Sequence, residues 1–365
     1  MEEQSSTAST QQPHLTDLAL RDFRCFRSIT LEPHPGLNFI IGPNAQGKTT
    51  LLEAACVLLR LKSPRTSVLS EVIHFGEQGF GLEGCYGEAH MAMRYTPQGE
   101  PKRLLTLDGV TQQSTNDYLS MGRIVWFGSD DREIVNGPGE RRRRFLDSAG
   151  LQLGTDYRRL LRFYERALRS RNMLLRAQRP RREIEAYDHP LAESGDALLA
   201  ARAALCQELA PRALAACASI SGENMLLTYK PGATTPMLEA LADSKIKESQ
   251  LGLTQVGPHR DDLLLSLNGV PAGTFASEGQ RRTVALALKL ALARLLDDHG
   301  PTPPLLLLDD VFGELDQERR SALLAGIPKG SQALLTTTDL KTIDLPSEST
   351  IFELFDNQLK ELAPA

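Results

Sequence analysis

Apolar and polar residues alternate near both ends of this chain as they do in strands, and they follow a helical period in its middle. Residues 15–31 are expected to be rich in strand, and Leu37-Asn38-Phe39-Ile40-Ile41 is a short apolar run typical of a buried strand. Residues 49–61 then repeat apolar side chains at helical spacing. From 80 to 111, short alternating runs broken by glycine and by Asp108-Gly109 predict an antiparallel meander.

The second half of the chain again mixes short strands with longer helices. Strands are expected at 224–229, 259–267, 305–308 and 332–336, with Asn268-Gly269 closing a hairpin. Helices are expected at 277–296 and 316–325. Because strands and helices alternate at both ends of the chain, the pattern favours an α/β class with a parallel sheet.

The stretch between these two regions is predicted to be helical. Five apolar residues recur at helical spacing and therefore share one stripe: Tyr157, Leu161, Tyr164, Leu168 and Leu175. A second helical run, rich in Ala and Leu, covers 191–218. We therefore expect a helical arm at 128–221, inserted in a head made of 15–127 and 222–365.

Charge is distributed unevenly along the chain. The net charge is −5, yet residues 139–182 contain fourteen arginines and only four acidic residues, so this segment carries +10 and the remainder −15. Such an asymmetry suggests a basic interaction surface on an acidic body. Arg158, Arg162 and Arg169 fall on one flank of the helix predicted there. The flank contacts DNA phosphates, or it is a solvated face paired with acidic residues.

The cysteines and the N-terminal residues indicate the cellular compartment in which the protein is expected. The five cysteines are scattered and form no Cys-x-x-Cys, which argues against a zinc site or a disulfide framework and for a reducing cytoplasm. No apolar run approaches the roughly 20 residues that span a bilayer. Residues 1–14 are polar, without a signal-peptide pattern, and are expected to be a disordered tail. A cytoplasmic protein without a membrane partner is expected.

A glycine-rich loop joins the strand predicted at 37–41 to the helix predicted at 49–61. It fits Gly-x4-Gly-Lys-Thr, whose backbone N–H groups bind phosphate at the start of a helix. The lysine supplies a cation and the threonine hydroxyl can ligate Mg²⁺. The expected nucleotide contacts are Gly42, Pro43, Asn44, Ala45, Gln46, Gly47, Lys48, Thr49 and Thr50.

Two carboxylates, Asp309 and Asp310, follow the apolar run at 305–308. Side chains at the end of a buried strand emerge at the rim of a sheet, so both carboxylates are expected over the phosphates. As in other phosphate-loop ATPases, Asp309 is expected to hold Mg²⁺ together with Thr49. Paired acids also end strands simply for solubility, which is the alternative interpretation.

Ser277-Glu278-Gly279-Gln280 resembles the signature of ATP-binding-cassette (ABC) ATPases. The resemblance implies that Ser277, Gly279 and Gln280 contact ATP held by the opposite subunit of a dimer. It also places Asp310 where most ABC enzymes have a glutamate that positions the attacking water, so the expected catalytic residues are Lys48, Asp309 and Asp310. A shorter acid there suggests slow turnover. As an alternative, Ser277 is simply the N-cap of the helix that follows.

A narrower resemblance extends over nearly the whole chain after the tail. It rests on Leu20-Arg21-Asp22-Phe23-Arg24-Cys25-Phe26, Gly257-Pro258-His259-Arg260-Asp261-Asp262, Ser277 to Arg282, the run from Asp309 to Asp316, and Arg142 to Asp147. Together these motifs resemble the RecF family of bacterial recombination-mediator ATPases. The chain departs from the superfamily at Thr337 and Thr338, which stand where a switch histidine is usual.

This resemblance implies an ABC-type ATPase head, with a mixed sheet that carries the loop and an antiparallel β subdomain, and an inserted helical lateral domain. It implies ATP and Mg²⁺, an ATP-dependent homodimer, and weak DNA-stimulated hydrolysis that acts as a switch. It also implies binding to duplex and gapped DNA and single-strand/duplex junctions, and work with RecR and RecO in loading RecA. Arg24 joins the expected ATP contacts. The expected DNA contacts are Arg141, Arg142, Arg143, Arg144, Arg158, Arg162 and Arg169.

The sequence also bears on three rival functions. The ATPase of a transporter would be shorter and would lack the basic helical insert. A structural ATPase of the SMC type would need hundreds of heptad residues between loop and signature. In this chain only 228 positions separate Thr49 from Ser277, and the head itself requires many of them. A DNA-binding scaffold that holds ATP and hardly hydrolyses it stays open. So does the role of His259, either catalytic or a structural hydrogen-bond partner.

Overall fold

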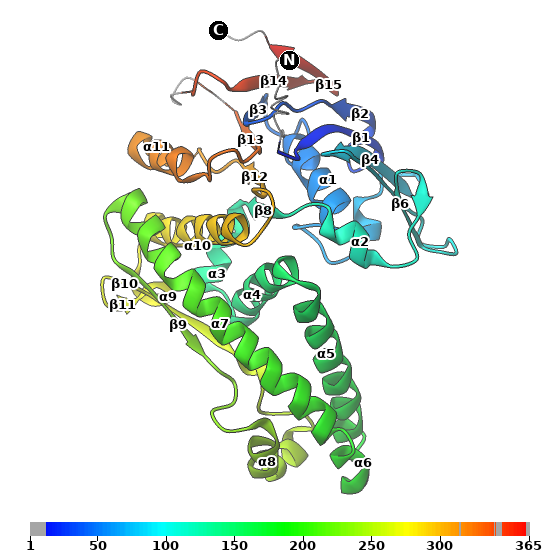
Figure 1. The fold of residues 1–365 in the computed structure, drawn as a ribbon, viewed down its shortest axis with the longest axis vertical. Helices are drawn as coiled ribbons and strands as arrows, with labels where there is room; N and C mark the ends of the chain where they lie inside the picture. The colour runs from blue at the N-terminus through cyan, green and yellow to red at the C-terminus, as the bar shows by residue number, and fades with distance from the viewer. Residues whose placement is uncertain (1–11, 314, 339, 341–344, 363–365) are drawn as a thin grey trace, which may run out of the picture. The chain divides into compact units, whose positions relative to one another are not determined.

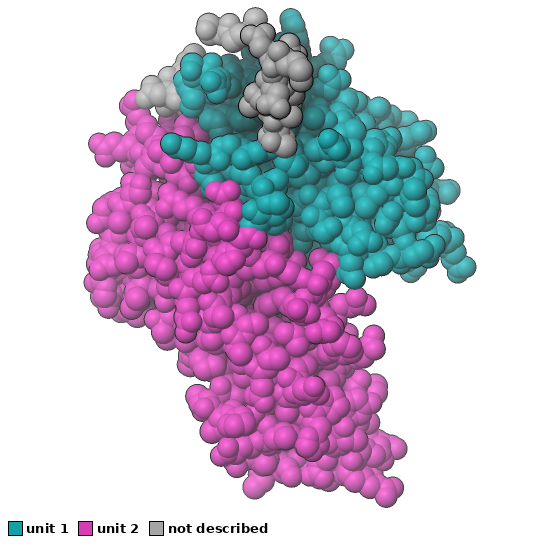
Figure 2. All heavy atoms as spheres, viewed as in Figure 1, with its two compact units in different colours: residues 1–128, 300–314, 328–365 teal, residues 129–299, 315–327 magenta. Residues whose placement is uncertain are grey.

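The structure, a computed structural model, describes residues 12–313, 315–338, 340 and 345–362 (Figure 1). Residues 1–11 of the expected tail lie outside this range. Residues 12–14 are placed, and the carbonyl oxygen of His14 accepts from the N–H of Gly87 at 2.9 Å. The described residues form two compact units, coloured separately in Figure 2. The first takes in those within 12–128, 300–313 and 328–362, and the second those within 129–299 and 315–327.

The first unit holds two six-stranded sheets. One is antiparallel, in the order β2 (Phe26–Leu31), β1 (Leu15–Phe23), β4 (Phe80–Tyr86), β5 (Ala89–Tyr95), β6 (Arg103–Leu107), β7 (Val110–Thr111). The other is mixed, in the order β15 (Gln358–Leu362), β14 (Thr350–Phe355), β3 (Leu37–Ile41), β13 (Ala333–Thr337), β12 (Leu305–Asp309), β8 (Ile124–Phe127). Only the β14–β15 pair is antiparallel there. The predicted meander and the expected mixed sheet are confirmed.

Helix α1 (Lys48–Arg60) packs against both sheets of this unit (Figure 1). Its apolar residues surround the whole helix, which is the pattern of a fully buried helix. Leu51, Leu52 and Leu58 have no exposed surface. The shorter helices of the unit are η1 (Leu69–Val72) and α2 (Thr115–Ser120).

The second unit is helical around a small antiparallel sheet. The sheet has the order β11 (Val270–Pro271), β10 (Asp262–Leu267), β9 (Met225–Lys230), and its β10–β11 hairpin turns at the predicted Asn268-Gly269. The helices are η2 (Ser129–Asp131), α3 (Arg132–Asn136), α4 (Gly139–Leu153), α5 (Thr155–Arg176), α6 (Arg181–Glu185), α7 (Asp188–Ser221), α8 (Met237–Leu251), η3 (Pro258–Arg260), α9 (Ala272–Phe275), α10 (Glu278–Asp298) and α11 (Gln317–Gly326).

The helical unit is larger than the expected arm. Its first boundary falls at 128/129, next to the expected one, but 222–299 and 315–327 also belong to it. The reason is packing, because β9 and α10 both lie against the 34-residue α7, and α11 contacts α7 as well. Along α5, Tyr157, Tyr164 and Leu175 of the predicted stripe are buried.

Two buried arginines hold this unit together. Arg171 of α5 donates to Asp188 and to Glu248, each at 2.8 Å, and so joins α5, α7 and α8. Arg202 of α7 donates to Asp147 at 2.8 Å and to Asp261 at 2.7 Å. A buried charge is tolerated only when it is paired and hydrogen-bonded, so these clusters fix how the helices meet.

His259 is a structural hydrogen-bond partner in this arrangement. Its Nε2 lies 2.9 Å from the carbonyl oxygen of Thr254, which only an N–H can satisfy, and its Nδ1 lies 2.6 Å from the hydroxyl of Tyr164. A neutral ring satisfies both contacts by accepting at Nδ1 and donating at Nε2. Burial lowers the pKa of His259 to about 4, and the nearby Arg260 and Arg143 also disfavour its charge.

This pKa predicts a pH-dependent stability. Between pH 6.5 and about 4 the unfolded chain protonates His259 and the folded chain does not, so the free energy of unfolding falls as the pH falls through this window. We expect His259→Gln, which keeps a donor and an acceptor, to lose stability less steeply there. Urea denaturation of both proteins at several pH values measures the two slopes. Equal slopes would contradict the assignment.

Among the described residues, no helix combines the length and the apolar content needed to cross a membrane. All five cysteines are free thiols.

Candidate functional site

The glycine-rich loop runs from β3 into α1, as predicted. Its two glycines are required by the backbone, which has φ of 147° at Gly42 and 100° at Gly47. A Cβ at Gly42 would lie 2.2 Å from the carbonyl oxygen of Leu354, and one at Gly47 would lie 2.5 Å from the ring of Phe26. The loop therefore passes too close to its neighbours for any side chain at these positions.

Lys48 lies at the start of α1, next to the loop. Its ammonium donates to the carbonyl oxygens of Gly42 at 2.6 Å and Pro43 at 2.8 Å. Burial lowers the pKa of Lys48, while the charges of Asp310 and Asp309 oppose this shift. A buried cation beside the N–H groups of a helix N-terminus is suited to bind phosphate.

The carboxylates at the end of β12 lie beside the loop. Asp309 Oδ1 accepts from the hydroxyl of Thr49 at 2.7 Å and from that of Thr336 at 2.9 Å. The same Thr336 oxygen accepts from the N–H of Asp310 at 2.9 Å, and Asp310 has a left-handed backbone with φ of 51°. Burial raises the pKa of Asp309, although the hydrogen bonds from Thr49 and Thr336 oppose the shift.

This donor set fits Mg²⁺. The Thr49 hydroxyl and the half-buried Asp309 carboxylate lie 2.7 Å apart, and both are hard oxygen ligands. Among the described residues, the hydrogen-bond partners of the Asp309 side chain are the hydroxyls of Thr49 and Thr336, and no cation pairs with it. Mg²⁺ is usually held by one or two carboxylates together with the phosphates of its nucleotide. Elsewhere in the described residues, no cluster of three or more His, Cys, Asp or Glu could hold a metal.

Arg24 belongs to a second charged group that includes the buried Glu53 of α1. Arg24 donates to Glu53 at 2.7 and 3.0 Å and to the carbonyl oxygen of Glu71 at 3.0 Å. Arg65 and Ser63 also donate to Glu53, at 3.3 and 2.6 Å. Glu53 has no exposed surface, so it needs these partners.

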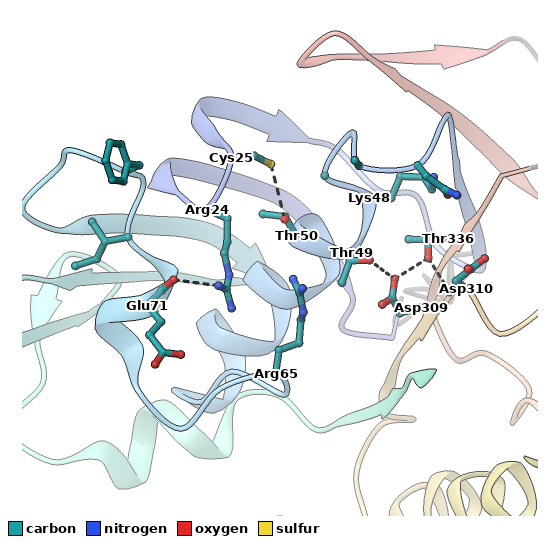
Figure 3. Close-up of a pocket in the computed structure, with 15 residues that line it drawn as sticks. Arg24, Cys25, Lys48, Thr49, Thr50, Arg65, Glu71, Asp309, Asp310 and Thr336 are labelled. Carbon is teal, nitrogen blue, oxygen red and sulfur yellow. Dashed lines mark hydrogen bonds between the residues drawn. The ribbon is translucent and has the colours of Figure 1, made fainter. Parts of the chain in front are cut away.

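One cavity of about 490 Å³ connects the loop, the carboxylates and the arginines. Figure 3 shows Lys48, Thr49, Asp309, Asp310 and Thr336 at one end, Arg24 and Glu71 at the other, and Cys25, Thr50 and Arg65 between them. The first unit therefore brings together Arg24, most of the predicted loop residues and both carboxylates. Of the nucleotide contacts expected from the loop, Gly42, Pro43 and Gln46 do not line the cavity. The lining residues are Arg24, Cys25, Asn44, Ala45, Gly47, Lys48, Thr49, Thr50, Arg65, Glu71, Ile73, Phe75, Asp309, Asp310 and Thr336.

The signature residues belong to the second unit, at the N-terminus of α10. The Ser277 hydroxyl accepts from the N–H of Gln280 at 3.2 Å, and the Gln280 side chain accepts from the N–H of Ser277 at 2.8 Å. Ser277 is thus an N-cap within a capping box, as the alternative interpretation expected. Ser277, Glu278 and Gly279 are exposed, so the cap leaves this surface open.

The run of four arginines in α4 is engaged within the second unit. Arg142 donates to Asp262 at 2.5 and 3.1 Å, and Arg143 donates to the carbonyl oxygen of Asp261 at 2.8 Å. Arg141 pairs with Glu133 at 2.5 Å and Arg144 with Glu140 at 2.5 Å. Arg142 and Arg143 are half-buried, and their donors point into the protein, which makes them structural rather than surface residues.

The arginines of α5 are more open. Arg162 and Arg169 are exposed and Arg158 is half-buried. Arg158 and Arg162 lie four positions apart on α5 and are therefore neighbours on the helix surface. Burial and the neighbouring charge of Arg162 lower the pKa of Arg158. Arg169 lies 3.6 Å from Glu165, a separation typical of a weak exposed pair.

Comparison with known proteins assigns the family. The model of the RecF/RecN/SMC N-terminal domain matches residues 14–357. The DNA replication and repair protein RecF of Moorella thermoacetica is 38% identical over 337 residues, which cover 89% of this chain and 90% of that protein. The chain is a member of the RecF family. The RecF of an Anaeromyxobacter species is also 38% identical, over 90% of this chain and 94% of its own.

Solved structures agree with this assignment. A structure of the recombination mediator protein RecF with ATP, in the RecFOR pathway, has a TM-score of 0.88 and 29% identity, and the match covers 98% of this chain and 100% of that one. An SMC head bound to a domain of ScpA matches with a TM-score of 0.57 at 15% identity, which shows the shared fold alone. The ABC-type ATPase fold expected from the sequence is confirmed.

The motifs of this RecF family member did not point to several residues of the site. Glu53 accepts hydrogen bonds from Arg24 and Arg65, and Thr336 donates to Asp309. Phe75 lines the cavity. Glu53 carried one weak signal, since it is an acid in the middle of a helix whose other faces are apolar. No local pattern marks Arg65, Thr336 or Phe75 as a residue of the site.

The geometry of the loop predicts the effect of one methyl group. Gly47→Ala would place a Cβ 2.5 Å from the Phe26 ring and 2.7 Å from the Cys25 sulfur, so we expect the loop to shift and ATP affinity to fall at least about tenfold. Gly36→Ala is the matched control, because Gly36 also has positive φ but nothing lies within 4 Å of the new Cβ. Calorimetric titration with ATP and Mg²⁺ measures both. Unchanged affinity in Gly47→Ala would contradict the site.

Proposed function

We propose that this protein is an ATP-controlled DNA-binding protein of replication-gap and recombinational repair. The observation that carries the proposal is the convergence of the phosphate loop with Asp309 and Asp310 in a chain of the RecF family. Similar proteins are named for DNA replication and repair, and one of them was solved with ATP in the RecFOR pathway. We extend this to duplex and gapped DNA, to single-strand/duplex junctions, and to loading of RecA together with RecO and RecR.

In this proposal ATP binds along the cavity of the first unit. The N–H groups of the loop and Lys48 hold the phosphates, and Thr49 and Asp309 hold Mg²⁺, which neutralises the phosphate charge when bound. Asp310 positions the attacking water. Aspartate is one methylene shorter than glutamate and its backbone is fixed by Thr336, which favours slow hydrolysis that resets the protein.

We propose further that ATP joins two copies of the chain. The exposed Ser277 and Gly279 at the N-terminus of α10 would donate to the γ-phosphate held by the other copy, as the ABC signature does. The capping box does not prevent this, because the Ser277 hydroxyl that accepts from Gln280 keeps its own proton for a second partner.

The dimer hypothesis predicts opposite effects for two variants. Asp310→Asn should bind ATP, hydrolyse it poorly and accumulate dimers. Ser277→Arg should bind ATP and stay monomeric, because the new side chain obstructs the surface that meets the second copy. Sedimentation with no nucleotide, ADP or ATP measures the mass. The same mass for the unmodified protein in all three conditions would contradict the proposal.

DNA contact is proposed for the exposed arginines of α5. Arg141 to Arg144 are less suited, since their donors are engaged within the unit. Arginine binds phosphate through two parallel hydrogen bonds, and the few aromatic residues of α5 are mostly buried, which favours a duplex backbone over stacked single strands.

The proposal that the arginines of α5 contact DNA predicts a change in how DNA affinity depends on salt. Replacing Arg158, Arg162 and Arg169 with Ala should weaken ATP-dependent duplex binding and lower the steepness of log affinity against log salt by about 0.9 for each lost phosphate contact. Alanine favours helix, so α5 should stay folded. Replacing the exposed Arg21, Arg27 and Arg94 of the antiparallel sheet changes the net charge equally and should leave the slope unchanged. An unchanged slope in the α5 variant would mean that this flank is only a solvated face.

A further inference from the structure

Thr336 is a buried polar residue that lines the nucleotide cavity although it has no exposed surface. It lies near the end of β13, between β3 and β12 in the mixed sheet, and it is paired with Asp309 of β12. Every residue of β13 is buried, and the three that precede Thr336 in the strand are apolar. A hydroxyl in such a strand needs hydrogen-bond partners, because an unpaired buried hydroxyl is unfavourable.

The Thr336 hydroxyl connects the two aspartates of the site (Figure 3). It donates its hydrogen to Asp309 Oδ1 at 2.9 Å, and it accepts from the N–H of Asp310 at 2.9 Å. A threonine hydroxyl has only one hydrogen to donate, so Asp309 fixes which way the hydroxyl points. The oxygen lone pairs are then directed away from Asp309, and one of them holds the backbone of Asp310.

Asp310 has a conformation that needs such support. Its φ of 51° lies in the left-handed region, which residues other than glycine rarely adopt and which recurs at functional sites. Asp310 is exposed, so packing does little to hold it. The hydrogen bond from its N–H to Thr336 therefore supplies a constraint on where its carboxylate lies.

We propose that Thr336 is a positioning residue for ATP hydrolysis, acting through Asp310. The proposal rests on the proposed function and adds to it how the residue that positions the attacking water is itself held. Asp309, the proposed Mg²⁺ ligand, orients the Thr336 hydroxyl, and the hydroxyl holds Asp310. The bond that prevents the short Asp310 from moving closer to the water also keeps its carboxylate in one place. Its loss should therefore lower a rate that is already slow.

Thr336→Val tests the hydroxyl, because valine is branched at Cβ like threonine but has no hydroxyl. We expect turnover at saturating ATP and Mg²⁺ to fall at least about tenfold, while the affinity for ATP changes less than about twofold, since Asp309 keeps its bond from Thr49. Phosphate release and calorimetric titration measure the two quantities. Thr336→Ser keeps the hydroxyl and should restore turnover.

Thr283→Val is the matched control. Thr283 of α10 also has no exposed surface, but its hydroxyl has no hydrogen-bond partner among the described residues. The same substitution there removes no hydrogen bond, so turnover should stay unchanged. A fall in Thr283→Val as large as that in Thr336→Val would overturn the proposal, because any buried threonine would then have the same effect.

A double variant separates positioning from a general effect on the fold. Asp310→Asn already hydrolyses poorly in the proposed function. If Thr336 acts through Asp310, adding Thr336→Val to Asp310→Asn should slow turnover no further. Losses that multiply in the double variant would overturn the proposal. So would unchanged turnover in Thr336→Val, or a loss of ATP affinity in it as large as the loss of turnover.

Lys48→Ala distinguishes this proposal from the one on which it rests. Full ATP binding in Lys48→Ala would overturn the nucleotide function itself. Loss of ATP binding in Lys48→Ala together with normal turnover in Thr336→Val would overturn only the role of Thr336.

Discussion

The burial of α1 between two sheets is the constraint on which the nucleotide site depends. Burying a leucine fully contributes roughly 1.5–3 kcal/mol, and α1 buries Leu51, Leu52, Leu58 and Leu59 completely. The position of its N-terminus is therefore fixed by packing along the whole helix. Lys48 and Thr49 begin the helix, so the same packing fixes where they lie.

The same burial places a carboxylate in the core of the first unit. Glu53 cannot turn toward solvent because the surrounding faces of α1 are packed. Its carboxylate therefore needs hydrogen-bond donors inside the protein, which Arg24, Arg65 and Ser63 supply. Removing one partner from a buried ion pair typically costs about 3–5 kcal/mol. Arg24 and Arg65, which both line the cavity, are thus held in place by a requirement of the fold.

Buried ion pairs also reduce the number of arginines in the basic segment 139–182 that can meet a ligand. Of the fourteen arginines between 139 and 182, Arg171 is fully buried and Arg142 and Arg143 are tied to the 261–262 segment. The −15 of the remaining chain includes their partners, Glu248 and Asp262 among them. The surface available to a polyanion is smaller than composition suggests, and it is concentrated on the exposed face of α5.

Local patterns located most of the elements that carry chemistry. The order of strand, loop and helix around Lys48, the meander from 80 to 111, and the hairpin at Asn268-Gly269 follow from periodicity and turn residues, which act within a few positions of the chain. No local pattern indicated the strands β14 and β15, of which β15 is at the edge of its sheet, or the helix α8. The domain boundary after 221 was expected too early, because β9 and α10 join α7 by packing between distant segments.

The sequence by itself determined the α/β class, the phosphate loop, the paired carboxylates and the family. Tertiary structure decided that Thr336 bridges Asp309 and Asp310, that Glu53 holds Arg24 and Arg65, and that Phe75 lines the same cavity. It also decided which arginines are structural. These facts depend on which side chains meet when distant segments pack, and on the free-energy cost of leaving a buried charge unpaired. A local sequence pattern reports neither, because both involve residues far apart in the chain.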